Sequence, residues 1–221
     1  MKGNSVLLDM DQADLDHLKP HLITRQAING ERLIAPGTMV ENVYFPESAV
    51  LTNIVTFADG RAAEAYLVGS EGVGGLAPFL AGIPSSSAVQ VKVPGTLHML
   101  ATDILVEVVE KSPSLRARLL RLLNEYQATA MVGLGCAVLH SASQRLASFI
   151  LTVCDRIGVE EVYLTQEEIA ASLNVQRTTV NAGATDLKAA RAIQYARGKI
   201  RVLDRDALRS AACECYRRGF A

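Results

Sequence analysis

A 22-residue run, LTQEEIAASLNVQRTTVNAGAT at residues 164–185, constrains the fold more than any other part of the sequence. Thr165 followed three residues later by Glu168 forms a capping box, a pairing that is typical of a helix start. Asn174 tolerates the left-handed backbone that a sharp reversal of the chain requires. The run therefore predicts two short helices joined by a tight turn.

The second helix of this pair combines an apolar anchor with an outward polar face. Val180 is the apolar anchor. The polar side chains around it are Gln176, Arg177, Thr178, Thr179 and Asn181. Side chains of these types hydrogen-bond to base edges in the major groove of DNA, so the pattern predicts a DNA-reading helix-turn-helix.

The distribution of charge agrees with this interpretation, although the formal net charge of the whole chain is only −1. Residues 1–141 carry 10 basic and 14 acidic side chains, whereas residues 142–221 carry 12 and 9. Residues 176–209 alone carry 8 basic and 3 acidic side chains. A basic segment that begins at the second helix provides the positive surface that contact with phosphates needs.

Other protein classes find little support in the sequence. No apolar run approaches the length of a membrane span, and acidic residues occupy the N-terminal region where a secretion signal needs an apolar core. No nucleophile is paired with a base in a catalytic pattern, so we expect no enzymatic activity. We expect a cytoplasmic protein with no membrane partner.

The four cysteines, Cys136, Cys154, Cys213 and Cys215, are too few and too clustered to indicate a disulfide framework. Residues two apart on a helix do not share a face, which argues against Cys213 and Cys215 as a metal or redox pair. We interpret both as partly buried structural cysteines. We therefore expect no metal site and no cofactor.

The remaining pattern predicts an α+β fold in three parts. A helical segment over residues 6–24 precedes short β-rich runs over 25–105, which alternate with turn signals and indicate an antiparallel β-roll of jelly-roll type. Apolar residues then recur every three or four positions over 114–140, as in one long helix. A helix over 143–157, the helix pair, a hairpin and a helix over 205–218 form a winged helix-turn-helix.

These parts give the expected domain limits. The β-roll effector domain covers residues 1–113, a dimerisation and connector helix covers 114–141, and the winged helix-turn-helix covers 142–221. Small residues crowd the second half of the long helix, which favours close packing against a second copy. The alternative is a helix that packs only on its own domain.

In this order of parts, and in the sequence LTQEEIAASLNVQRTTV, the chain resembles the Crp/Fnr family of bacterial transcription regulators. Arg177, Thr179 and Val180 match the family's Arg-x-Thr-Val core. The resemblance implies a homodimer that binds a pseudo-palindromic site in double-stranded DNA. If the protein is an activator, the resemblance also implies contact with RNA polymerase. The alternative is a nucleotide- or metabolite-sensing module whose helix-turn-helix contacts protein.

The resemblance also implies which residues touch DNA. The base-contact candidates are Gln176, Arg177, Thr178 and Asn181, and Thr179 is expected on a phosphate. The full expected DNA-binding set is Thr165, Gln176, Arg177, Thr178, Thr179, Asn181, Lys188, Arg197 and Lys199. Thr178 stands where the family often has glutamate, and Ala182 and Gly183 are small, so we expect a different operator. The basic hairpin around Arg197 and Lys199 is expected on phosphate, the alternative being a merely solvated hairpin.

Family members that bind cyclic nucleotides carry a phosphate and ribose cassette, which corresponds here to residues 71–89. Gly75 stands where the ribose-binding glutamate is expected, and Ser86 where the phosphate-binding arginine is expected. The candidate residues for a small-molecule effector are Gly72, Gly74, Gly75, Ser86, Ser87 and Ala88. Without the arginine a strong bidentate contact to phosphate is lost, so we expect no cyclic AMP binding in the usual mode.

Overall fold

The computed structural model describes residues 3–218, which divide into two compact units. One unit contains 3–56 and 66–127, and the other contains 57–65 and 128–218. Among the helices of the described residues, none combines the length and the apolarity needed to span a lipid bilayer. Each unit is described by itself below.

The first unit begins with short helical pieces and then changes to strand. These are α1 (Ser5–Leu8), α2 (Gln12–Leu18) and the 3-10 turn η1 (Lys19–His21). The helical segment expected over 6–24, with Pro20 as an interruption, does break at that proline, but the prediction is wrong for residues 23 and 24, which belong to a strand. Pro20 lies in η1 and cannot donate a backbone hydrogen bond, and β1 (Ile23–Ala27) starts two residues after η1 to pair with β7.

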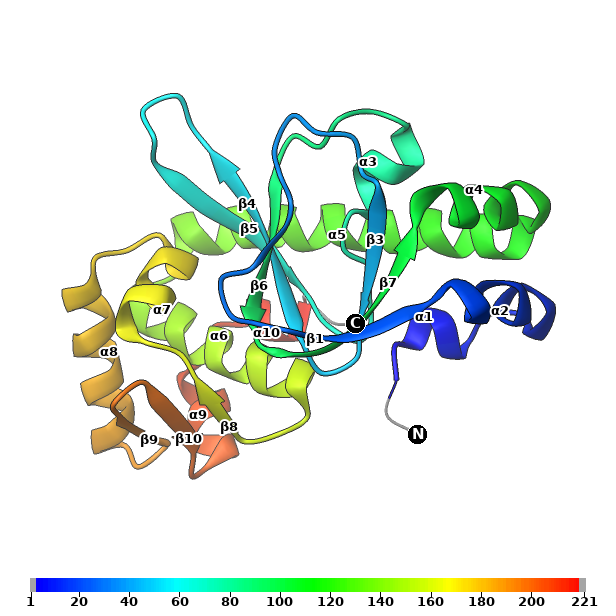
Figure 1. Ribbon diagram of the computed structural model, residues 1–221. Helices are drawn as coiled ribbons and strands as arrows, with labels where there is room; N and C mark the ends of the chain where they lie inside the picture. Colours follow the sequence, from blue (N-terminus) through cyan, green and yellow to red (C-terminus); the bar gives the residue numbers. More distant parts are fainter. Residues whose placement is uncertain (1–2, 219–221) are drawn as a thin grey trace. The chain divides into compact units, whose positions relative to one another are not determined.

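Two antiparallel sheets form the β-roll of this unit, as the sequence predicted (Figure 1). The first has the order β1-β7-β3, with β7 (Gly95–Ala101) between β1 and β3 (Asn42–Pro46). The second has the order β2-β6-β4-β5. Its strands are β2 (Arg32–Ile34), β6 (Ala88–Val93), β4 (Val50–Thr56) and β5 (Ala62–Val68), of which only residues 66–68 of β5 are counted in this unit.

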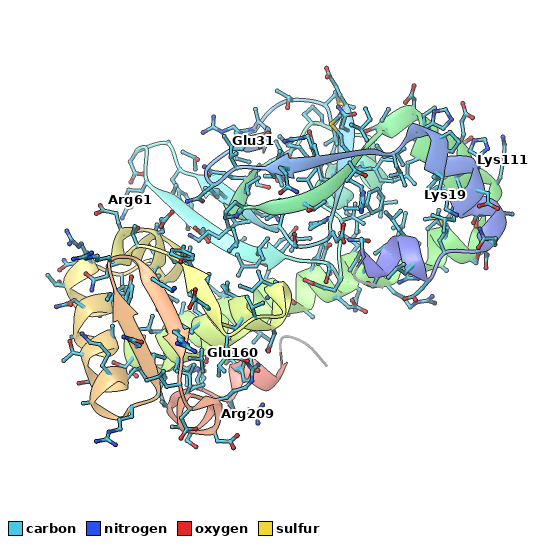
Figure 2. All side chains as sticks on the ribbon, turned by 60° about the horizontal axis from the view of Figure 1, so that its bottom comes forward. Lys19, Glu31, Arg61, Lys111, Glu160 and Arg209 are labelled. Atoms are coloured by element: carbon cyan, nitrogen blue, oxygen red, sulfur yellow. The ribbon has the colours of Figure 1, made fainter. Side chains whose placement is uncertain are left out.

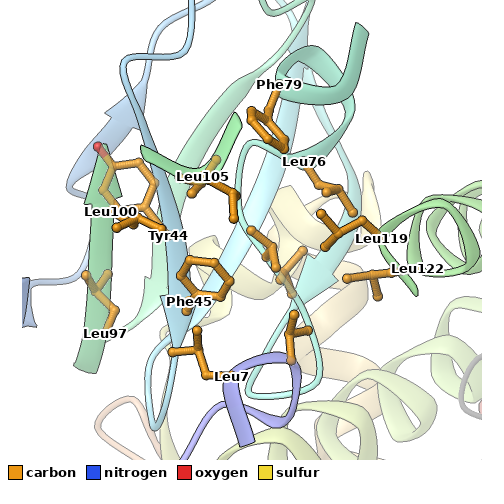
Figure 3. Packing of buried hydrophobic residues seen from close by; sticks show 14 of the residues in the cluster. Leu7, Tyr44, Phe45, Leu76, Phe79, Leu97, Leu100, Leu105, Leu119 and Leu122 are labelled. Atoms are coloured by element: carbon orange, nitrogen blue, oxygen red, sulfur yellow. The ribbon is translucent and has the colours of Figure 1, made fainter. Parts of the chain in front are cut away.

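The core of the first unit joins these strands to the helices around them, including α1, whose Leu7 is labelled in Figure 3. Phe45 and Leu97 come from the strands and are fully buried. Leu76 comes from α3 (Leu76–Ala81) and Leu105 from α4 (Thr102–Lys111). Leu119 belongs to the long helix α5, so this helix packs on the roll through its first half.

α5 (Pro113–Leu139) is one helix of 27 residues, as the spacing of apolar residues predicted. Its first half buries Leu115, Leu119, Leu122 and Tyr126, which recur every three or four positions. Its second half instead exposes large apolar side chains. The most exposed of these are Met131, Leu134, Val138 and Leu139.

The second unit contains α6 (Ala142–Ile157), where Ser141 and Gln144 form a capping box. The helix pair consists of α7 (Gln166–Leu173) and α8 (Arg177–Ala189). A three-stranded antiparallel sheet of order β8-β10-β9 packs beside it (Figure 1). Its strands are β8 (Glu161–Tyr163), β10 (Lys199–Val202) and β9 (Ile193–Ala196).

The C-terminal helix expected over 205–218 is broken into two. Asp204 caps α9 (Arg205–Ala211) by accepting a hydrogen bond from the Ala207 amide, and α10 (Cys215–Arg218) follows after an interruption. Ala212 has an extended backbone, with φ −77° and ψ 154°, which ends α9. The prediction of one continuous helix is therefore wrong.

Candidate nucleic-acid interface

The turn between α7 and α8 has the geometry that its sequence predicts. The Thr165 hydroxyl accepts from the Glu168 amide, and the Glu168 carboxylate accepts from the Thr165 amide at 2.7 Å. Asn174 ends α7 with a φ of 51°, in the left-handed region. The Arg145 guanidinium, which comes from α6, donates to the Leu173 carbonyl and so satisfies a free group at the end of α7.

α8 packs against α6 through a face of small and apolar side chains. Val180, Ala184 and Leu187 are buried on it. A Cβ atom added to Gly183 would lie 3.1 Å from the Ser143 hydroxyl oxygen and 3.2 Å from a Leu146 methyl carbon. Position 183 therefore needs a small residue, because the two helices approach closely here. The sequence alone did not reveal this close approach.

The opposite face of α8 presents the recognition surface, which we define as Gln176, Arg177, Thr178, Thr179 and Asn181. All five are exposed. Gln166 donates from its amide nitrogen to the Asn181 side-chain oxygen at 3.0 Å, so a residue of α7 orients one member of the surface. Gln166 carries no local sequence signal for this role, because its partner lies 15 positions away.

The wing is the hairpin of β9 and β10 with the turn Arg197-Gly198 between them. Arg197 has a φ of 52° and Gly198 a φ of 78°, the signs found in a type I′ hairpin turn. The Gly198 carbonyl accepts from the Leu164 amide at 2.8 Å. The Tyr195 hydroxyl donates to the Leu164 carbonyl at 2.8 Å, and burial raises the pKa of Tyr195 to about 12. The wing is thus fixed to the start of α7.

Between α7, α8 and the wing lies a groove of about 480 Å³. Four of the residues expected on DNA line it. They are Thr165, Arg177, Lys188 and Arg197. The remaining lining residues are Gln166, Glu167, Tyr195, Ala196 and Gly198. Three cationic side chains against one carboxylate give this groove a positive balance beside the recognition surface, which suits a polyanion.

Residues 144–211 match the family model of the Crp-like helix-turn-helix domain. This part of the chain is a Crp-like helix-turn-helix domain. The family resemblance read from the sequence is thereby confirmed, and the helix pair, the recognition surface and the wing all lie inside the domain. Among curated protein sequences, no significant match to the chain was found.

Solved structures of regulators share the fold well beyond the Crp-like domain. FixK2 from Bradyrhizobium japonicum is 16% identical, with a TM-score of 0.75 over 87% of this chain and 98% of that one. A Crp/Fnr-family transcriptional regulator from Thermus thermophilus is 20% identical, with a TM-score of 0.70 over 86% and 98%. The c-di-GMP-responsive regulator CLP from Xanthomonas campestris is 13% identical, with a TM-score of 0.67 over 87% and 99%.

Lys199, one of the residues expected on DNA, already forms an ion pair within the protein. The Lys199 ammonium lies 2.7 Å from a Glu161 carboxylate oxygen and 5.4 Å from the centre of the Tyr163 ring. The hydrogen bond to Glu161 raises the pKa of Lys199, so the side chain is charged. Lys199 is outside the lining of the groove, and Glu161 competes with any phosphate for it.

In the first unit, the three glycines expected around an effector are closely packed, whereas the serines are not. Gly72, Gly74 and Gly75 are buried, and a Cβ atom at Gly75 would lie 2.7 Å from an Ile34 methyl carbon. Gly75 also has a φ of 86°, which L side chains rarely adopt. Ser86 is exposed, Ser87 is half-buried and Ala88 is buried.

A separate groove of about 270 Å³ in this unit is lined by residues between Leu33 and Tyr44, and none of the six expected effector residues lines it. The structure therefore does not bring those six residues together around this groove. The glycines serve close packing before α3, which a sequence pattern cannot distinguish from ligand approach.

Proposed function

We propose that this chain is a sequence-specific DNA-binding transcription regulator of Crp/Fnr type, acting as a homodimer and not as an enzyme. The observation that carries the proposal is the convergence of the recognition surface with the positive groove. Arg177 belongs to both, Lys188 follows on the same helix, and Arg197 projects from the wing. Such a face can read bases and hold the adjacent phosphates at once.

Within this proposal the residues of the recognition surface have distinct roles. Arg177 makes a bidentate contact to guanine in the major groove. Asn181, whose side-chain oxygen is occupied by Gln166, has its amide nitrogen available to donate to a base acceptor. Thr179 contacts phosphate near the start of α8. Thr178, in place of an acidic side chain, removes an acceptor for cytosine and so changes the operator.

The proposed homodimer forms through the second half of α5. Met131, Leu134 and Val138 are spaced by three and four residues and are strongly exposed, at 66%, 72% and 77%. Such a stripe is what a helix buries against a second copy of itself. A two-fold axis there places two α8 helices in successive major grooves about 34 Å apart, on a pseudo-palindromic site. If the dimer is an activator, it also contacts RNA polymerase.

We expect no tight binding of cyclic AMP through the β-roll cassette. A glutamate at position 75 would need a strained backbone and the space that Ile34 fills, and Ser86 offers no cation for the phosphate. Titration calorimetry of the purified chain with cyclic AMP should show no saturable heat, with a cyclic AMP-binding family member as positive control. Tight one-to-one binding would contradict this expectation.

Replacement of Lys199 by alanine should weaken binding about equally on all DNA sequences and lower the salt slope by up to about one unit, because its proposed contact is with phosphate. Glu161→Gln should act in the opposite direction, since it frees the Lys199 ammonium. Lys111→Ala, on α4 and labelled in Figure 2, removes the same charge from the first unit as a control. A loss confined to one DNA sequence contradicts the phosphate role.

Selection of bound sequences from a random pool of double-stranded DNA tests the proposed function as a whole. The expected product is an inverted repeat whose half-site centres are one helical turn apart. A pool that stays random after repeated rounds, with folded protein, would favour a helix-turn-helix used for protein contact instead.

A further inference from the structure

Four potential metal ligands converge in the second unit, away from the recognition surface. They are Cys136, His140, Cys213 and Cys215. Their ligand atoms, three Sγ atoms and one imidazole nitrogen, all lie within 4.8 Å of one another. The Cys136 and Cys213 Sγ atoms are 3.5 Å apart, and the Cys215 Sγ atom is 3.5 Å from His140 Nδ1. Below we call this group the Cys3His cluster.

We propose that the Cys3His cluster binds a single zinc ion. Zinc in structural sites takes four ligands in a tetrahedron, and three cysteines with one histidine are among its common sets. With Zn–S bonds of about 2.3 Å and a Zn–N bond of about 2.05 Å, the edges of such a tetrahedron measure about 3.8 Å between two sulfurs and about 3.6 Å between sulfur and nitrogen. The two separations of 3.5 Å are close to these values, so a small adjustment of the side chains completes the site.

The backbone brings the four ligands together in two pairs. Cys136 and His140 are four residues apart at the end of α5, where the His140 amide still donates to the Cys136 carbonyl at 3.1 Å, so both side chains lie on one helical face. Cys213 lies in the interruption between α9 and α10, and Cys215 begins α10. The expectation that Cys213 and Cys215 point apart assumed a continuous helix, which the structure does not have.

The surroundings of Cys213 are also those of a metal ligand. Its side chain is buried, with a relative exposure of 4%. The Ser148 hydroxyl accepts from the Cys213 amide at 3.2 Å and lies 3.1 Å from the Cys213 sulfur, to which it can donate its own proton. A donor held in this way stabilises a thiolate and orients it, as second-layer partners of metal sites do.

Two other uses of the cluster fit the geometry less well. A disulfide between Cys136 and Cys213 would employ two of the groups and leave the convergence of His140 and Cys215 unexplained. An iron–sulfur cluster spreads its four ligands over two or four iron atoms and so holds the set farther apart than one ion does. Zinc uses all four groups and releases the thiol protons to solvent as the Zn–S bonds form.

Metal analysis of the full-length chain, purified under reducing conditions and loaded with Zn²⁺, tests the proposal. We expect about one zinc per chain in the wild type and a near-complete loss in Cys213→Ser. Cys136→Ala and His140→Ala change half-buried positions that tolerate truncation, and circular dichroism checks that each variant is folded. Cys154→Ala, which removes a buried cysteine of α6 outside the cluster, should keep the zinc.

Substitution of Co²⁺ for Zn²⁺ reports the geometry directly. Thiolate-to-cobalt charge transfer and strong visible bands of tetrahedral cobalt are expected in the wild type and in Cys154→Ala. Charge transfer should weaken in Cys136→Ala, which removes one thiolate, and the visible bands should shift in His140→Ala, which removes the nitrogen ligand. Folded, reduced wild-type protein that binds neither metal stoichiometrically overturns the proposal. So does iron with inorganic sulfide in the cluster, or a Cys136–Cys213 disulfide that persists under reduction. None of these readouts depends on DNA binding.

Discussion

Arg177→Ala should erase the preference for one base pair in each half-site of the selected operator while leaving weak binding to any DNA intact. Arg177 is exposed at the start of α8 and lines the groove, so its removal leaves the helix in place. A bidentate arginine–guanine contact contributes about 1–3 kcal/mol, which corresponds to roughly 5- to 150-fold in affinity. Fluorescence anisotropy with the operator and its single-base variants measures both effects.

A matched control distinguishes this base contact from a general loss of charge. Arg209→Ala removes an arginine of α9, labelled in Figure 2 and outside the lining of the groove, and should leave the preference unchanged. If Arg177→Ala keeps the full preference at every position, Arg177 does not read the base and the assignment of the recognition surface is wrong. An equal loss on all DNA sequences would place Arg177 on phosphate.

Gly183→Leu should both destabilise the second unit and abolish specific DNA binding. Helix propensity alone predicts the opposite sign, because leucine favours a helix over glycine by nearly 1 kcal/mol. Even a Cβ atom at position 183 lies only 3.1 Å from Ser143 and 3.2 Å from Leu146, so a leucine forces α6 and α8 apart. Overpacking of this kind costs about 1–3 kcal/mol, and thermal unfolding by circular dichroism reports it.

The control for this change lies on the same helix. Ala189→Leu introduces the same side chain at an exposed position in the last turn of α8. Stability and specific binding should both stay near the wild type. A Gly183→Leu protein with an unchanged or raised melting temperature would show that α6 and α8 do not pack at this point as described.

The helix pair could be predicted from the sequence because its signals are local. Thr165, Glu168 and Asn174 act within a few residues of themselves, and the structure shows the capping box and the left-handed turn that they predict. The long helix followed from the spacing of Leu115, Leu119 and their successors. Local hydrogen bonds and helical periodicity need no knowledge of the rest of the fold.

The features that the sequence did not reveal depend on residues far apart in the chain. Gln166 meets Asn181 only because α7 and α8 fold against each other, and Glu161 reaches Lys199 only through the pairing of β8 with β10. The Cys3His cluster joins residues 77 positions apart. Its one local signal was the four-residue spacing of Cys136 and His140, which indicates a shared helical face but not what faces it.

The β-roll stretch shows the limit of family comparison in the same way. The resemblance to the Crp/Fnr family made Gly75 a candidate for an effector pocket. The structure gives it a packing role before α3 as well, because it has a positive φ and a Cβ atom there would lie 2.7 Å from Ile34. A glycine can serve a turn, close packing or a ligand, and only the neighbours in space decide between them.

The central claim, sequence-specific recognition of DNA by α8, is tested most directly by competition at physiological salt. The affinity of the wild-type chain for its selected operator is compared with its affinity for scrambled DNA of the same length and composition. We expect an operator preference of about 10³-fold or more, as specific regulators show. A preference below about tenfold, with folded protein and intact operator, would contradict it.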